Sequence, residues 1–151
     1  MQGLFRLFFE MRTAVRIFRW QIAKTMAKIL VVDDEPTVRA FLGESLRKAK
    51  FEVLQATNGE EALALVASVR PDLVLLDVRM PGIDGFEVLK RIRNSPATRG
   101  LPVIFLTGSN LEVDELVRTL ELDPSDFLTK GASSRELVAR IRWVLRRPVP
   151  R

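Results

Sequence analysis

Five short runs rich in apolar residues recur along this chain, at positions 28–34, 51–56, 72–77, 102–107 and 126–130. Within the first and third runs, Ile, Leu and Val follow one another with no alternating polar residue. This pattern is typical of strands that are buried on both faces of a parallel sheet. We therefore predict five strands, with the runs at 28–34 and 72–77 in the centre of the sheet.

Helical spacing of apolar residues separates these runs. The first helix is predicted to begin at Pro36, because proline suits the first turn of a helix. Its buried stripe is expected to comprise Val38, Phe41, Leu42, Ser45, Leu46 and Ala49. The second helix is predicted to start at Asn58, which with Glu61 resembles a capping box, and to end before Pro71.

Three further helices complete the alternation. Asp84 is predicted to cap a helix that ends near Asn94, and another helix is predicted over 110–122. Ser133 and Glu136 form a capping box that opens the last helix, which runs to about position 147. Five strands alternating with five helices predict an α/β fold, a doubly wound parallel sheet covered by helices on both faces.

Residues 1–25 differ in character from the rest of the chain. Apolar residues recur there at helical spacing among basic ones, so a basic amphipathic helix is predicted, with a disordered extension as the other state. One interpretation is a helix that contacts a membrane surface or docks a partner. The other, which we prefer, is that the natural start is Met26. The predicted organisation is thus an extension at 1–25, one domain at 26–147 and a tail at 148–151.

Charge and composition exclude several classes of function. Residues 1–25 carry five basic groups against one acidic group, a net charge of +4, and residues 135–151 have a net charge of +5. Residues 26–134 have 13 basic and 17 acidic groups, a net charge of −4, which argues against nucleic-acid binding by the domain. The chain has no cysteine and no histidine. Disulfides, thiol chemistry, Cys/His zinc sites and histidine triads are therefore excluded, and a reducing cytoplasm is compatible with this composition.

Polar side chains stand where the predicted strands end. Asp33 and Asp34 follow the first strand, and Asp77 ends the third. With the strand order 2-1-3-4-5, these strands are neighbours at the point where the order reverses, so the three carboxylates are expected to converge. Crowded carboxylates raise one another's pKa unless a cation neutralises them, and oxygen-only ligands suit Mg²⁺ or Mn²⁺. The sequence therefore predicts a metal-assisted phosphoryl site.

Two further groups end strands at the same edge, Thr107 on the fourth strand and Lys130 on the fifth. A lysine ammonium is a strong partner for phosphate, and a hydroxyl can donate a hydrogen bond to a phosphate oxygen. With Asp77 as acceptor, these groups would stabilise a transferring phosphoryl group.

The motifs in their order resemble the receiver domain of bacterial two-component response regulators, over residues 26–147. They are Val-Val-Asp-Asp-Glu-Pro at 31–36, Leu-Leu-Asp-Val-Arg-Met-Pro-Gly-Ile-Asp-Gly at 75–85, Leu-Thr at 106–107 and Asp-Phe-Leu-Thr-Lys at 126–130. The resemblance implies a flavodoxin-like three-layer sandwich. It departs at Gly131, where the family usually has proline, and in the loop 122–125, which lacks a Gly-Ala pair.

The resemblance also implies a role for each site residue. Asp77 would be the phosphoacceptor, which takes a phosphoryl group from the phosphohistidine of a kinase. Asp34, Asp77 and the backbone carbonyl of Arg79 would contact Mg²⁺, or Mn²⁺, directly, with Asp33 acting through water. Lys130 would pair with the phosphate. Thr107 would move to bond the phosphate, and Phe127 would turn inward with it; the other interpretation of Phe127 is a core aromatic that never moves.

Partners follow from the same resemblance. The chain would be a stand-alone, cytoplasmic receiver, not an enzyme, phosphorylated by a sensor histidine kinase or a phosphotransfer protein. Its output would be a changed surface on the helix at 110–122, the strand at 126–130 and the last helix. On that last helix, a cluster of arginines at positions 140, 142, 146 and 147 is either a surface for a partner or a second copy, as in a homodimer, or a solvated face.

Two alternatives belong to other classes. One is a Mg²⁺-dependent phosphohydrolase or phosphotransferase, for which the short loops offer no substrate pocket. The other is a structural adaptor in which the acidic site is vestigial and residues 1–25 carry the function.

Overall fold

Five parallel strands form a single sheet in the order β2-β1-β3-β4-β5. The computed structural model describes residues 2–108, 115 and 121–147, and for 18–25 only the course of the helix. The strands are β1 (Lys28–Val32), β2 (Glu52–Ala56), β3 (Leu73–Asp77), β4 (Val103–Thr107) and β5 (Asp126–Thr129). The order confirms the predicted doubly wound α/β fold.

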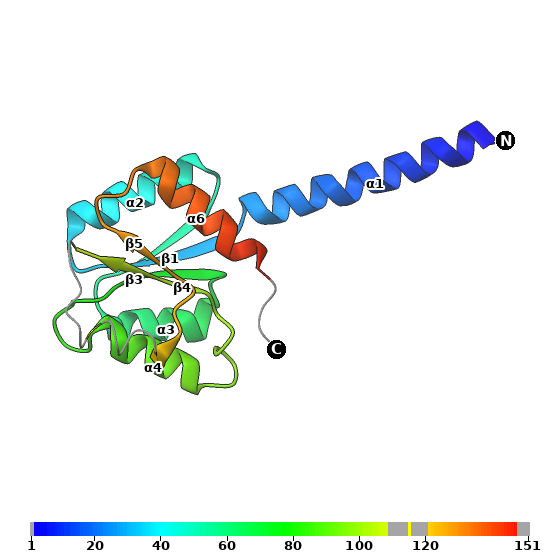
Figure 1. Ribbon diagram of the computed structural model, residues 1–151. Helices are drawn as coiled ribbons and strands as arrows, with labels where there is room; N and C mark the ends of the chain where they lie inside the picture. Colours follow the sequence, from blue (N-terminus) through cyan, green and yellow to red (C-terminus); the bar gives the residue numbers. More distant parts are fainter. Residues whose placement is uncertain (1, 109–114, 116–120, 148–151) are drawn as a thin grey trace.

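Helices cover both faces of this sheet (Figure 1). On one face lie α2 (Pro36–Lys48) and α6 (Ser134–Arg146), and on the other lie α3 (Gly59–Val69) and α4 (Gly85–Asn94). Alternate residues of a strand point to opposite faces. Ile29 and Val31 accordingly pack with the α2 and α6 side chains, whereas Leu30 and Val32 pack with those of α3 and α4. Because both faces are covered, the unbroken apolar run of β1 is buried completely.

The helix starts follow the predicted caps. The side chains of Asn58, Asp84 and Ser133 each accept a hydrogen bond from the backbone N–H three residues later. The predicted capping box at Asn58 is incomplete. The Glu61 carboxylate accepts a hydrogen bond from the hydroxyl of Thr57 instead of from the backbone N–H of Asn58. These caps provide acceptors for N–H groups of the first turn, which have no carbonyl partner within the helix.

Phe41 corrects the predicted stripe of α2. It is 43% exposed, whereas Leu42, Ser45 and Leu46 are buried. Position 41 lies roughly a quarter turn from the centre of the stripe. The buried side chains of α2 centre on Leu42 and Leu46, so Phe41 lies at the edge of the stripe and its ring is partly in solvent.

One predicted helix lies largely outside the described residues, and one described helix lies outside the sandwich. The helix predicted at 110–122 lies largely outside the described residues; Glu115, Glu121 and Leu122 are described and are helical. Ahead of β1, α1 (Gln2–Thr25) is one continuous helix that projects away from the sheet and its covering helices (Figure 1). Within the described part of the chain, no helix has both the length and the apolar character needed to cross a membrane.

Candidate functional site

The site is built at the carboxyl ends of the two central strands. Asp33 follows Val32, the last residue of β1, and Asp77 is the last residue of β3. Val32 and Leu76 are partners in the parallel register of these strands, so the two aspartates leave the sheet side by side. Asp33 is fully buried and Asp77 is 3% exposed. Of the three carboxylates expected to converge, Asp33 and Asp77 lie side by side, whereas Asp34 is exposed and groups with Asp33 and Glu35.

Lys130 brings its ammonium group to both carboxylates. The Nζ atom lies 3.0 Å from Oδ2 of Asp33 and 3.2 Å from Oδ2 of Asp77, and it donates a hydrogen bond of 3.3 Å to Glu35. The backbone places it there, because the N–H of Lys130 donates to the carbonyl of Thr107 at 2.8 Å, just beyond the β4–β5 pairing. Residues that are far apart in the chain thus meet around one ammonium group.

Burial sets the electrostatics of this group. Desolvation, together with the nearby charge of Asp33, raises the pKa of Asp77 to about 6, although Lys130 and the backbone N–H of Arg79 pull it down. Desolvation lowers the pKa of Lys130, but its contacts with Asp33 and Asp77 outweigh this, and the net pKa lies above the ordinary value. The lysine therefore stays charged, while burial holds the pKa of Asp77 at about 6.

Local hydrogen bonds orient the aspartates. Oδ1 of Asp33 accepts from the N–H of Glu35 at 2.9 Å, and Oδ1 of Asp77 accepts from the N–H of Arg79 at 3.3 Å. Gly85 is required beside Asp77, since a Cβ atom there would overlap the carbonyl oxygen of Asp77. The start of α4 can therefore lie directly against the end of β3.

The donor set fits a hard divalent cation. Oδ2 of Asp33 and Oδ2 of Asp77 are buried, and neither accepts a hydrogen bond of good geometry, although both lie within ion-pair distance of Lys130. Buried carboxylate oxygens are costly without a charged partner, and oxygen ligands suit Mg²⁺ or Mn²⁺. Exposed Asp34 lies beside Asp33, so water can complete a coordination shell.

Glu35 is the site residue that the sequence reasoning missed. Among the described residues, the acidic group whose oxygens lie within 4.8 Å of one another comprises Asp33, Asp34 and Glu35. Asp77 is linked to that group through Lys130. The signal of Glu35 in the sequence is its place as the third acid of the run at 33–35, directly before Pro36.

Arg79 directs its side chain away from the carboxylates. Its guanidinium forms a two-pronged ion pair with Glu115, with contacts of 3.1 and 2.8 Å. The predicted metal ligand is the backbone carbonyl of Arg79, which takes no part in this ion pair. The loop after β3 is thereby joined to the segment at 110–122.

Thr107 and Phe127 lie on β4 and β5. Thr107 ends β4, is partly buried and binds the Lys130 backbone through its carbonyl oxygen. The half-buried ring of Phe127 lies 5.9 Å from the ring of Phe105, within the core on the α3 and α4 side. The predicted switch roles of Thr107 and Phe127 stay predictions.

The arginine cluster of α6 is partly satisfied within the domain. Arg140 pairs with Asp126 of β5 at 3.1 Å, and Arg147 donates to the carbonyl of Ser125 and lies over the ring of Trp143. Arg142 and Arg146 are exposed. Two of the four arginines thus hold α6 against the segment that leads into β5.

Comparisons with known proteins agree with this geometry. Residues 29–142 match the family model of the response regulator receiver domain. The phosphate regulon transcriptional regulatory protein PhoB of Pseudomonas aeruginosa is 41% identical over 122 residues, which are 81% of this chain and 53% of that protein. The alkaline phosphatase synthesis transcriptional regulatory protein PhoP of Bacillus subtilis is 41% identical over 120 residues, 80% of this chain and 49% of its own length.

A solved structure gives the same result in three dimensions. The chemotaxis protein CheY4 of Vibrio cholerae superposes with a TM-score of 0.73 at 29% identity, over 79% of this chain and 98% of that one. This chain spans about half the length of the curated relatives that it matches. From the fold, the strand-end carboxylates and these matches, the chain belongs to the response regulator receiver domain family.

Proposed function

We propose that this receiver domain accepts a phosphoryl group on Asp77 from the phosphohistidine of a histidine kinase or a phosphotransfer protein. Receiver domains are signalling modules that bind Mg²⁺ at an acidic pocket and interact with such donors and with downstream targets. The observation that supports the proposal here is the shared contact of Lys130 with the buried carboxylates of Asp33 and Asp77. The stand-alone organisation and the cytoplasmic location stay predictions.

The chemistry is a transfer of phosphorus from nitrogen to oxygen. A carboxylate oxygen of Asp77 attacks phosphorus, the P–N bond breaks, and its electron pair stays on the imidazole of the donor. Lys130 would balance the negative charge on the transferred group, and the hydroxyl of Thr107 would donate a hydrogen bond to it. A bound Mg²⁺, held by Asp34, Asp77 and the Arg79 carbonyl with Asp33 through water, would supply further positive charge at the phosphoryl oxygens.

The output is proposed to be a changed surface on β5, α6 and the segment at 110–122. Arg140 ties α6 to Asp126, the residue before Phe127, and Arg79 ties the loop after β3 to Glu115. A movement of Thr107 or Phe127 would therefore strain contacts that join these elements. The downstream target is proposed to be a protein that recognises this surface.

Mass spectrometry of the intact chain tests the acceptor. Incubation with acetyl phosphate and Mg²⁺ is expected to add about 80 Da, one PO₃H group, to the wild type. Asp77→Asn is expected to remove this adduct, because the amide lacks the nucleophilic carboxylate. Asp72→Asn, an exposed position just before the same strand, serves as the matched control and is expected to retain it.

Removal of Mg²⁺ with EDTA is expected to suppress the adduct in the wild type. An adduct of equal yield in Asp77→Asn would refute the assignment of the acceptor. No adduct on the wild type, under conditions that label a control receiver, would refute the proposed function.

A further inference from the structure

The side chains of α1 are left uncovered by the rest of the domain. All described side chains of this helix, at positions 2–17, are exposed. Leu4 is 81% exposed, Phe5 82% and Phe9 70%. The described polar contacts of the helix are internal, from Arg6 to Glu10 and from the Thr13 hydroxyl to the carbonyl of Phe9. Large apolar side chains in water at this density indicate a surface that binds something.

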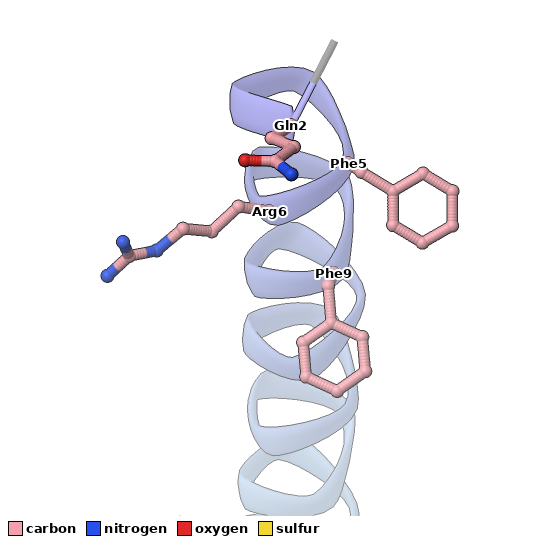
Figure 2. Close-up of a pocket in the computed structure, with 4 residues that line it drawn as sticks. All are labelled: Gln2, Phe5, Arg6 and Phe9. Carbon is pink, nitrogen blue, oxygen red and sulfur yellow. The ribbon is translucent and has the colours of Figure 1, made fainter.

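The apolar side chains form a continuous stripe. Leu4, Leu7, Phe8, Met11 and Val15 follow the spacing of three and four residues that places side chains on one face of a helix. Phe5 and Phe9 lie beyond one edge of this stripe, on the side of the helix where Arg12 and Arg16 also fall. Figure 2 shows their rings projecting from the same side of α1, with Arg6 extending the other way, around the shallow hollow that Gln2 also lines.

Charge decides between the occupants that such a stripe can take. Residues 1–25 contain five basic groups and one acidic group, and Arg6, Arg12 and Arg16 are exposed among the aromatic side chains. A second copy of α1 would bring an equal positive charge against the first and would leave Phe5 and Phe9 outside a narrow helix–helix seam. An anionic lipid surface attracts the arginines and accepts both the apolar stripe and the aromatic rings that lie among the arginines.

We propose that α1 lies on the surface of an anionic lipid bilayer. The stripe would enter the boundary between headgroups and acyl chains, and Arg6, Arg12 and Arg16 would lie among the lipid phosphates. This placement needs no membrane-spanning segment, because the helix lies in the plane of the interface.

The position of α1 keeps the phosphorylation site accessible. The helix ends at Thr25 and joins β1 at Lys28, the amino end of the strand, whereas Asp33 and Asp77 lie at the carboxyl ends (Figure 1). Attachment through α1 therefore holds the domain at the membrane by the sheet edge opposite the site. The lipid binding is expected to be independent of phosphorylation and to be unchanged in Asp77→Asn.

Vesicle flotation of the full chain tests the proposal. The wild type is expected to float with vesicles of equal parts phosphatidylglycerol and phosphatidylcholine, and to bind pure phosphatidylcholine vesicles about 100-fold more weakly. A triple Arg6→Gln, Arg12→Gln, Arg16→Gln variant is expected to lose about 100-fold in affinity for the anionic vesicles. A Leu4→Gln, Phe8→Gln variant, which keeps the charge, is expected to lose affinity on a similar scale, about 100-fold.

A charge-matched control separates a specific helix from general basicity. Lys48→Gln, Lys50→Gln and Lys90→Gln together remove three exposed cations from the domain and are expected to leave vesicle binding unchanged. Equal binding to anionic and neutral vesicles, or binding that survives both α1 variants, would overturn the proposal. The proposal would also be overturned if the wild type floated with no vesicle and formed a dimer in light scattering that the Leu4→Gln, Phe8→Gln variant did not form. A second copy of the chain would then be the occupant of the stripe.

Discussion

Replacing Lys130 with methionine is expected to lower both the stability of the domain and its capacity to accept phosphorus. The ammonium contacts the buried carboxylates of Asp33 and Asp77, so its removal leaves two adjacent negative charges without a cation. Breaking a buried ion pair in this way costs about 3 kcal/mol of unfolding free energy. The yield of the acetyl phosphate adduct is expected to fall about 100-fold, because the variant lacks the positive charge that stabilises the transferring phosphoryl group.

Urea unfolding in EDTA at about pH 8 measures the loss of stability, with Lys90→Met as the control at an exposed position of α4. At about pH 5 the loss is expected to shrink, since protonation of Asp77 removes one of the two repelling charges. Mg²⁺ is expected to restore part of the stability. A Lys130→Met variant with wild-type stability at the higher pH and a wild-type adduct yield would contradict the assigned role of this lysine.

Asp77→Asn is expected to stabilise the metal-free domain above neutral pH. Burial raises the pKa of Asp77 to about 6 from 3.8, so the folded state binds a proton that the unfolded state has already released. A raised carboxyl pKa makes stability fall as the pH rises from the unfolded value through the folded one. The asparagine variant avoids this fall. The expected gain is about 2 kcal/mol, less than the full pKa shift would give, because Lys130 loses one partner.

The gain should have a defined pH window. It is expected to be complete above about pH 7 and to vanish below about pH 3, where Asp77 is protonated in both states. Chemical unfolding of both proteins in EDTA across this range gives the difference directly, and the acid end serves as the internal control. A gain that is the same at both ends, or a loss of stability at about pH 8, would show that Asp77 is not held in a costly ionised state.

Much of the fold could be predicted because its determinants are local. The unbroken run that ends at Asp33 and the one that ends at Asp77 identify central strands, and Asn58, Asp84 and Ser133 identify helix starts by short-range hydrogen bonds. The strand order then brings the strand ends to one edge. Phe41 was wrongly assigned to the buried stripe, because residue spacing alone does not define how far a buried stripe extends around a helix.

The contacts of the site depend on side chains that meet only in the folded chain. Residue type alone suggested that Lys130 pairs with phosphate, but not that its ammonium group contacts three acids, including Glu35, when no phosphate is bound. The two-pronged contact of Arg79 with Glu115 spans 36 positions and leaves no local pattern. The projection of α1 also required the structure, since an apolar stripe in the sequence is equally typical of a helix packed on a core.

The placement of one divalent ion tests the central claim most directly. Mn²⁺ takes the same oxygen ligands as Mg²⁺ and can be located by its anomalous scattering in a crystal of the full chain. The account predicts one peak in contact with the carboxylates of Asp34 and Asp77 and with the backbone carbonyl of Arg79. A peak held by Asp34 and Glu35 with Asp77 outside its coordination shell, or no peak at the strand ends, would contradict it.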